Sequence, residues 1–375
     1  MTRRPRILIA PLNWGLGHAT RCIPIIRHLI YIGCEVVIAG NGISGQVLKV
    51  EFPDLKYVEL PDFSMKYSRS KGLVKWKILV QLVKLLTNVK KERTYLNKFL
   101  EKNQFDALIS DNRFGFWHPS IPTVFITHQL RVISPFGSLS TNLLEKIQRN
   151  WFNRFTECWI PDFKKEPSLA GTLSHPSKLP EKKVRYLGPL SRFEPVRPEQ
   201  LENAGRQTDI DCLISLSGPE PQRSVLEEIL LKEARSMHQK IVLVRGLPGE
   251  YGKPKEIDSG KVEVYNYADA VLMNQLVNRA KLVVARSGYT TVMDLLKLGK
   301  KAIFIPTPGQ TEQEYLAKHL SETNLACCFD QKDFSLREAI RKAGEFPFHF
   351  PYKPEDMENY KTAVEEFVRS LAYSR

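Results

Sequence analysis

Short apolar segments alternate with amphipathic segments of roughly ten residues along much of this chain. The clearest case is the stretch 281–320, where apolar runs at 281–285 and 301–305 each lead into a polar turn and then into a helical pattern. Strands that alternate with helices in this way are typical of a parallel sheet. Such sheets bind ligands beyond the carboxyl ends of their strands, which is where both polar turns are expected to lie.

The same alternation extends over both halves of the chain. In the first half, strands are expected at Arg6–Ala10, Glu35–Ala39, Phe105–Ser110, Thr123–Thr127, Trp159–Asp162 and Val184–Leu187. In the second half, further strands are expected at Asp211–Leu216, Lys240–Arg245 and Val262–Tyr267. A chain of 375 residues is long for one hydrophobic core. An α/β fold with two domains joined by a hinge is therefore the default expectation.

The first polar turn suits an anionic ligand. It contains Ser287-Gly288 and opens the helix predicted at about 289–298. The first turn of a helix offers unpaired N–H groups and a partial positive charge to a phosphate. Thr290 or Thr291 adds a hydroxyl, and Asp294 follows them by one turn on the same helical face. A carboxylate beside a phosphate site is well placed to accept both hydroxyls of a ribose.

The second polar turn suits a sugar. Gln310 and Gln313 carry neutral amides, which donate and accept hydrogen bonds at sugar hydroxyls. Phosphate, ribose and sugar together describe a nucleotide-sugar. A simpler alternative is open for each turn, because Thr311 with Glu314 forms a capping box without any ligand and Ser287-Gly288 alone is an ordinary strand-to-helix turn. The two units in tandem favour the nucleotide-sugar.

The charge of the chain indicates an anionic partner. A formal net charge of +14 and a pI near 9.4 fit a membrane surface, nucleic acid or phosphorylated substrates, and charge alone does not choose among them. The six cysteines form no CxxC pair and no cluster with histidines at metal-ligand spacing. We therefore expect a reduced, cytosolic protein without structural zinc. The apolar run 7–10 is too short for a signal peptide, and no run reaches the length of a membrane span.

A basic and strongly apolar segment lies between residues 63 and 91. It contains no acidic residue, and a helical pattern begins at position 71. Lysines at seven-residue steps with a tryptophan suit a helix on the surface of an anionic bilayer. The candidate membrane residues are Lys71, Lys75, Trp76, Lys77 and Lys84. The alternative is a buried helix whose lysines extend to water. Nucleic acid is not expected as a partner, because the positive charge lies beside aliphatic rather than stacking aromatic side chains.

Two sequence motifs resemble those of a known family. They read Ala-Arg-Ser-Gly-Tyr-Thr-Thr-Val-Met-Asp at 285–294 and Phe-Ile-Pro-Thr-Pro-Gly-Gln-Thr-Glu-Gln-Glu-Tyr at 304–315. Both resemble the carboxy-terminal domain of family 28 glycosyltransferases, whose best-known member completes lipid II in peptidoglycan synthesis. The resemblance implies a GT-B fold, in which two Rossmann-like domains face a cleft. It also implies transfer from a nucleotide-sugar without a metal ion, and no other cofactor is expected.

The resemblance assigns different tasks to the two domains. Residues 1–188 are expected to bind the acceptor, and residues 189–355 the nucleotide-sugar. The hinge is placed near Gly188, where a polar, strand-free segment begins. A final helix at 356–375 is expected to return and pack on the first domain.

The acceptor side is expected to hold the catalytic groups. In the family, the loop after the first strand faces the cleft and offers its histidine, here His18, close to the reacting centre. Gly15 and Gly17 lie in this loop, but the third glycine of a dinucleotide fingerprint is missing, so NAD is not expected. Asp111 and His128 follow later strands and are candidates for accepting a proton or orienting the acceptor. The alternative for each is a purely structural role.

A third polar turn follows the strand predicted at 211–216. The family holds the diphosphate there with a glycine-rich turn. This chain has two prolines instead, which remove two N–H donors, so Ser217, Gly218 and Arg223 are expected to provide more of the contact. The family also contacts the base with backbone after a later strand, where Ala268 is the nearest match.

The leading hypothesis is a metal-independent, inverting glycosyltransferase. It would move a hexose or N-acetylhexosamine from a UDP-sugar to a hydroxyl acceptor, including a lipid-linked acceptor at the inner membrane surface. His18, or failing that Asp111, would take the acceptor proton, while Asp294 binds the ribose and Gln313 the donor sugar. Helix N-termini would neutralise the leaving diphosphate. The alternatives are a nucleotide-sugar epimerase of the same fold and a non-catalytic membrane-binding module.

Overall fold

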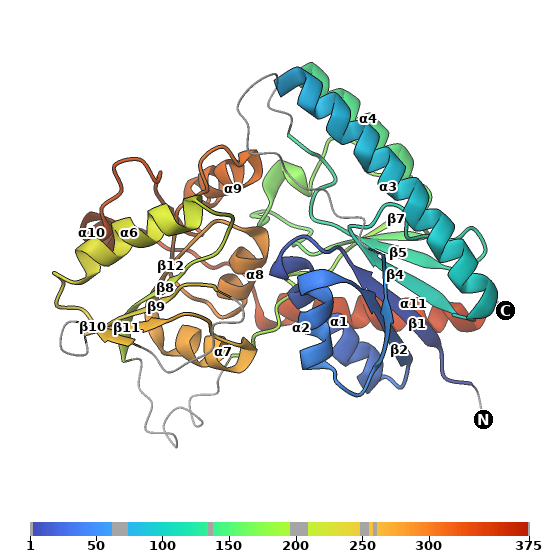
Figure 1. Cartoon of the computed structure of the whole chain (residues 1–375), viewed down its shortest axis with the longest axis horizontal. Helices are drawn as coiled ribbons and strands as arrows, with labels where there is room; N and C mark the ends of the chain where they lie inside the picture. The colour runs from blue at the N-terminus through green and yellow to red at the C-terminus, as the bar shows by residue number, and fades with distance from the viewer. Residues whose placement is uncertain are drawn as a thin grey trace.

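The chain folds into two α/β domains that lie side by side (Figure 1). The computed structural model describes residues 3–61, 74–133, 138–195, 209–247, 255–257 and 261–373. Within these ranges each domain is built on one seven-stranded sheet. The prediction of two Rossmann-like domains with parallel sheets is therefore confirmed.

The sheet of the first domain is parallel throughout. Its strands are β1 (Arg6–Pro11), β2 (Glu35–Gly40), β3 (Lys56–Glu59), β4 (Ala107–Asp111), β5 (Thr123–Ile126), β6 (Glu157–Ile160) and β7 (Lys183–Tyr186). They lie in the order β3-β2-β1-β4-β5-β6-β7. Every residue of β4 and β5 is buried, which is why these strands appear in the sequence as continuous apolar runs. The edge strand β3 is only partly buried, and the hydrophobic pattern therefore does not predict it.

The sheet of the second domain is parallel except at one edge. Its strands are β8 (Ile210–Ser215), β9 (Ile241–Val244), β10 (Lys255–Ile257), β11 (Val262–Tyr265), β12 (Ala280–Ala285), β13 (Ala302–Phe304) and β14 (Cys327–Cys328). They lie in the order β10-β11-β9-β8-β12-β13-β14, and β10 runs antiparallel to β11. The edge strands β10 and β14 are short, and the sequence pattern does not predict them.

Helices connect the strands in both domains. The first domain contains α1 (Leu16–Tyr31), α2 (Gly42–Glu51), α3 (Val74–Lys102), α4 (Ser138–Phe152) and the short 3₁₀ helix η1 (Gly171–Leu173). The second contains α6 (Gln222–Ala234), α7 (Ala270–Arg279), α8 (Tyr289–Lys297), α9 (Thr311–Glu322) and α10 (Leu336–Glu345). The chain then passes through η2 (Pro354–Glu358) into α11 (Asn359–Tyr373).

Each sheet has a point at which the strand order reverses. In the first sheet this point lies between β1 and β4, where Pro11 pairs with Asp111 at the carboxyl ends of the strands. In the second it lies between β8 and β12, where Ser215 pairs with Ala285. Ligands of open α/β sheets bind in the crevice at such points. The helices α1 and α8, which begin at these two points, contact each other across the domain boundary.

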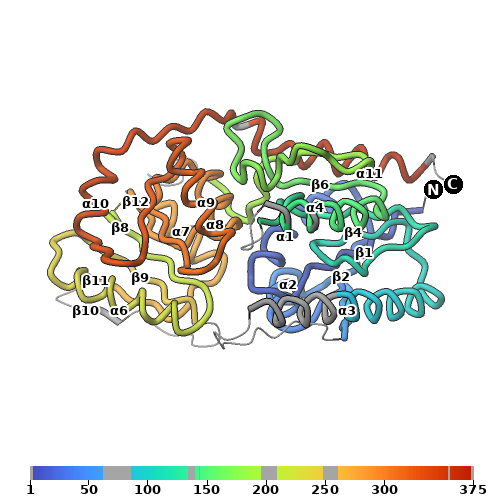
Figure 2. Tube along the Cα trace, turned by 90° about the horizontal axis from the view of Figure 1, so that it is seen from above, coloured from blue at the N-terminus to red at the C-terminus, as the bar shows by residue number. Residues whose placement is uncertain are grey.

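The last helix returns to the first domain. Figure 2 shows α11 running along that domain, with the carboxyl end of the chain near its amino end. The Phe367 ring packs edge-on against Trp159 of β6, with 5.6 Å between the ring centroids. His28 Nε2 of α1 lies 3.2 Å from a carboxylate oxygen of Glu365. The helix α11 therefore covers one face of the first sheet. The position of the domain boundary near Gly188 stays a prediction.

We expect the packing of α11 to be required for the stability of the first domain. Phe367 is 1% exposed, so Phe367→Ala removes a buried ring and should lower the free energy of unfolding by about 3–5 kcal/mol. Denaturant unfolding followed by tryptophan fluorescence measures this, because Trp159 is the ring it contacts. Arg369→Ala, on the exposed side of the same helix, is the control and should change stability by about 0.5 kcal/mol or less. Equal effects of the two variants would contradict this account.

Candidate functional site

The loop between β1 and α1 brings the first domain against the second. Gly15, with a φ of 77°, precedes the first residue of α1, so the helix begins earlier than the predicted Thr20 and His18 lies in its first turn. Gly17 lies against α8 of the other domain, because a Cβ at this position would be 2.6 Å from the Thr290 hydroxyl oxygen. The absence of a side chain at position 17 therefore permits the close approach of the two helices.

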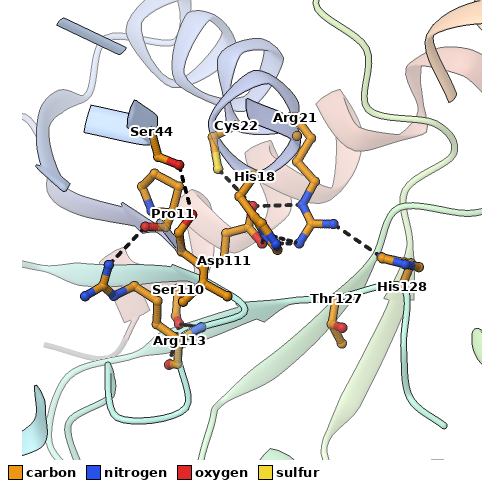
Figure 3. A network of polar contacts seen from close by, with 12 residues as sticks. Pro11, His18, Arg21, Cys22, Ser44, Ser110, Asp111, Arg113, Thr127 and His128 are labelled. Carbon is orange, nitrogen blue, oxygen red and sulfur yellow. Dashed lines mark hydrogen bonds and ion pairs between the residues drawn. The ribbon is translucent and has the colours of Figure 1, made fainter. Parts of the chain in front are cut away.

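His18 and Asp111 form a hydrogen-bonded pair at the carboxyl edge of the first sheet (Figure 3). Asp111 ends β4 and is fully buried. His18 Nδ1 lies 3.1 Å from Asp111 Oδ1. Arg21, one turn further along α1, donates from Nε to Asp111 Oδ2 over 2.8 Å and from Nη2 to Oδ1. The sequence predicted His18 and Asp111 as candidates, and the structure brings them together.

The electrostatics of this pair suit a neutral histidine beside an ionised aspartate. Burial alone would raise the pKa of Asp111, but Arg21 and His18 outweigh it and hold that pKa well below its usual range. Burial, reinforced by the positive charge of Arg21, lowers the pKa of His18. When His18 Nδ1–H donates to Asp111, Nε2 keeps its lone pair. This is the protonation state that a general base requires at neutral pH.

His128 links this pair to the second domain. Its Nδ1 lies 3.3 Å from Arg21 Nη1, and its Nε2 lies 2.8 Å from Glu312 Oε1 in α9. The imidazole stacks on the ring of Tyr289, with 4.0 Å between centroids and 9° between planes. The Tyr289 hydroxyl in turn donates to the backbone oxygen of Pro161 over 2.6 Å. Residues from both domains thus form one continuous polar cluster.

The two polar turns of the second domain are bonded to each other. The buried Ser287 hydroxyl donates to the backbone oxygen of Gln313 over 2.8 Å. The Gln313 side-chain oxygen accepts from the backbone N–H of Thr307 over 2.9 Å. Gln310 precedes the first residue of α9 as Gly288 precedes that of α8. The residues predicted to bind the nucleotide-sugar therefore lie at the N-termini of two adjacent helices, and helix N-termini favour the binding of an anion.

Thr307 is a candidate that the sequence did not reveal. It is 2% exposed, and its hydroxyl has no hydrogen-bond partner among the residues that the structure describes. That hydroxyl lies 3.8 Å from where a Cβ on Gly218 would be. Gly218 has a φ of 106°, a conformation that favours glycine. The turn after β8, which was predicted to bind the diphosphate, therefore lies next to the turn after β13, with the Thr307 hydroxyl beside the Gly218 backbone.

Two arginines of the second domain have different surroundings. Arg223, which the sequence assigned to the diphosphate, is ion-paired with Glu220 and Glu227 of its own segment. Arg286 was not predicted, although it lies in the quoted motif. Its guanidinium is buried among uncharged groups and donates to the backbone oxygens of Ile305, Pro306 and Gln222 and to the Gln331 side chain. Burial lowers the pKa of Arg286 to about 10.

Asp294 lies beside the segment that joins the domains. It is 8% exposed and accepts a hydrogen bond from the Ser191 hydroxyl. Ala268, the residue predicted to lie near the base, is buried just before Asp269, which caps α7 by accepting from Leu272 N over 2.8 Å. The contact of Asp294 with a ribose and that of Ala268 with a base therefore stay predictions.

The predicted membrane residues fall mostly outside the described part of the chain. Lys71 precedes α3, and the side chains of Lys75, Trp76, Lys77 and Lys84 in α3 lie outside the described residues. Within the described part, no helix is both long and apolar enough to cross a membrane. Membrane binding through this helix therefore stays a prediction.

Comparison with known proteins identifies the second domain. The sequence model of the glycosyltransferase family 28 C-terminal domain matches residues 222–367. This domain belongs to glycosyltransferase family 28. The match supports the prediction of a family 28 glycosyltransferase.

The similar proteins are transferases. The chain is 26% identical over 183 residues to the UDP-N-acetylglucosamine--N-acetylmuramyl-(pentapeptide) pyrophosphoryl-undecaprenol N-acetylglucosamine transferase of Sulfurihydrogenibium, and this match spans about half of either chain, 46% and 48%. An uncharacterised glycosyltransferase of Methanosarcina mazei is 22% identical over 333 residues, or 84% of this chain and 83% of the relative.

Solved structures show the same fold over nearly the whole chain. The kitacinnamycin glycotransferase superposes with a TM-score of 0.64 at 14% identity, covering 100% of this chain and 96% of the other. MurG of Acinetobacter baumannii superposes with a TM-score of 0.54 at 12% identity, covering 99% and 100%. The expectation of a GT-B fold is therefore confirmed.

We expect Asp294 to make stability depend on pH. Burial raises the pKa of Asp294 to about 6, so folding favours its protonated form. Its contribution to the free energy of unfolding is complete below about pH 4 and is lost as the pH rises through about 6. Asp294→Asn should therefore match wild type near pH 4 and exceed its stability at pH 8 by up to about 3 kcal/mol. Denaturant midpoints measured across this range provide the test.

Asp54→Asn, at an exposed position, is the control and should follow wild type at every pH. A constant difference between Asp294→Asn and wild type from pH 4 to 8 would show that Asp294 is not protonated on folding.

Proposed function

We propose that this protein transfers a hexose or N-acetylhexosamine from a UDP-sugar to a hydroxyl acceptor, with inversion at the anomeric carbon. The observation that carries the proposal is the His18–Asp111 pair at the carboxyl edge of the first sheet. The residue before His18, Gly17, packs against Thr290 in the first turn of α8 in the second domain. A base on one domain and an anion-binding surface on the other are the two parts that transfer from a nucleotide-sugar requires.

The proposed donor is a UDP-sugar. Support comes from the family 28 domain and from relatives whose names specify UDP-N-acetylglucosamine. The N-termini of α8 and α9 would stabilise the leaving diphosphate, together with Ser217, Gly218 and the Thr307 hydroxyl. Gln310 and Gln313 would contact the sugar, and Asp294 the ribose. In this proposal the diphosphate is neutralised by backbone N–H groups and requires no metal ion.

The proposed chemistry uses one proton transfer. His18 Nε2 accepts the proton of the acceptor hydroxyl while the oxygen attacks the anomeric carbon on the face opposite the diphosphate. The bond to the diphosphate oxygen breaks, and the anomeric configuration inverts. Asp111 accepts from His18 Nδ1–H, so it fixes the tautomer and stabilises the imidazolium that forms.

The proposed acceptor carries an apolar portion. Trp14, four residues before His18, is 55% exposed, and a tryptophan ring with this exposure would offer a stacking surface to an apolar acceptor. The undecaprenol-linked acceptors named for the relatives have this character. With the net charge of +14, they support a lipid-linked acceptor at the cytoplasmic face of a membrane. All six cysteines are free thiols, which fits a reducing compartment.

We expect UDP to bind without a divalent metal, with a Kd in the micromolar range, and TDP and NAD to bind much more weakly. Calorimetric titration measures these affinities. Asp294→Ala should abolish UDP binding if its carboxylate holds the ribose, whereas Ser191→Ala, which removes only the linker contact, should preserve it. Unchanged affinity in Asp294→Ala would mean that the carboxylate serves the linker alone. No UDP binding by wild type would contradict the donor assignment.

We expect His18→Ala to lower the rate of transfer by about 10²–10⁴-fold while leaving UDP affinity within twofold of wild type. The rate is measured as UDP release in the presence of a lipid-linked acceptor. A variant that transfers normally would exclude His18 as the base. Interconversion of UDP-sugars without any acceptor would instead favour the epimerase.

A further inference from the structure

A series of polar contacts crosses from the first domain to the second. Figure 3 shows the Arg21 side chain between Asp111 and His128. Arg21 Nε lies 2.8 Å from Asp111 Oδ2, and Arg21 Nη1 lies 3.3 Å from His128 Nδ1. His128 Nε2 then lies 2.8 Å from Glu312 Oε1, in the first turn of α9. The carboxylate that orients His18 is thus connected to a carboxylate of the other domain.

The direction of each hydrogen bond in this series is fixed. A guanidinium only donates, so Arg21 requires His128 Nδ1 to accept. A neutral His128 therefore carries its proton on Nε2 and donates it to Glu312. The same contact lowers the pKa of Glu312 against the opposing effect of burial. Each member of the series holds the next in one orientation.

Arg21 and His18 compete for one acceptor. Arg21 Nη2 lies 2.9 Å from His18 Nδ1, and both nitrogens donate to the same oxygen, Asp111 Oδ1. Arg21 and Asp111 are 2% and 0% exposed, so water does not relieve this competition. The contact between Arg21 Nη1 and His128 Nδ1 holds the guanidinium on the side away from Asp111. A shift of Arg21 toward Oδ1 would displace His18 from it.

We propose that Glu312 is a positioning residue for the base, acting through His128 and Arg21, so that His18 is correctly held only when the second domain lies against the first. The proposal rests on the proposed function, in which His18 is the base. Stacking of His128 on Tyr289, also from the second domain, keeps the imidazole in the plane that this hydrogen bond requires. Bringing the donor domain into contact would thereby complete the acceptor domain's catalytic pair.

The kinetic test compares two replacements of Glu312. Glu312→Gln keeps an oxygen that accepts from His128 Nε2–H, whereas Glu312→Ala removes it. We expect Glu312→Ala to lower kcat at least tenfold with the donor KM within twofold, and Glu312→Gln to restore kcat to within threefold of wild type. Glu322→Ala, exposed at the far end of α9, is the control and should leave both constants unchanged.

His128→Ala should lower kcat as Glu312→Ala does, and the double variant should be no more than twofold worse than either single variant. Multiplicative losses would show that the two residues act separately and would overturn the proposal. A raised donor KM with unchanged kcat in Glu312→Ala would also overturn it, because Glu312 would then bind the donor sugar directly, as its neighbour Gln313 is proposed to do.

An activity-independent measurement separates this proposal from the proposed function. Nitrogen NMR of the imidazoles should show His128 protonated at Nε2 in wild type. Glu312→Ala should change the signals of His128 and His18 together, and Glu322→Ala should change neither. An unchanged His18 signal in Glu312→Ala would overturn the link even in an active enzyme. A different result is that wild type transfers no sugar while Glu312→Ala still changes both histidine signals as expected. That result would support the link between Glu312 and His18 and contradict the proposed function instead.

Discussion

The carboxylate of Asp111 is fully buried at the carboxyl end of β4, and a buried charge is tolerated only when it is paired and hydrogen-bonded. Arg21 supplies the opposite charge and His18 a further donor, so the first turn of α1 must lie directly over the end of β4. The parallel pairing of β1 with β4 brings the loop and the strand end together. The arrangement of His18 beside Asp111, in which we propose the base, is therefore a consequence of satisfying one charge within the first sheet.

The same constraint extends into the contact between the domains. Arg21 engages His128, and His128 is held from the other side by Tyr289 and Glu312 of the second domain. A single hydrophobic cluster includes side chains of both sheets, and Gly17 allows α1 and α8 to approach closely. The domains thus share apolar packing as well as polar contacts. The site belongs to neither domain alone.

The sequence predicted those parts that depend on local pattern. Alternating apolar and amphipathic segments predict the central strands, and helix N-termini after those strands predict the polar turns near 287 and 310. The sequence did not reveal Arg21 as the partner of Asp111, or Glu312 as that of His128, because these pairs are separated by 90 and 184 positions. Only the register of the folded sheets brings them together. Short, partly exposed edge strands such as β3 were missed for a different reason, since they bury little apolar surface.

The return of α11 to the first domain means that the chain passes between the domains twice. The two passages lie beside each other, because a Cβ on Gly188 would be 2.2 Å from the backbone oxygen of Asp356. Two adjacent covalent connections form a hinge. They oppose sliding and twisting of one domain over the other, and they leave rotation about the hinge axis as the easiest motion. Opening about this hinge would separate the His128 and Glu312 side chains, and closing would return them to the same relative position each time.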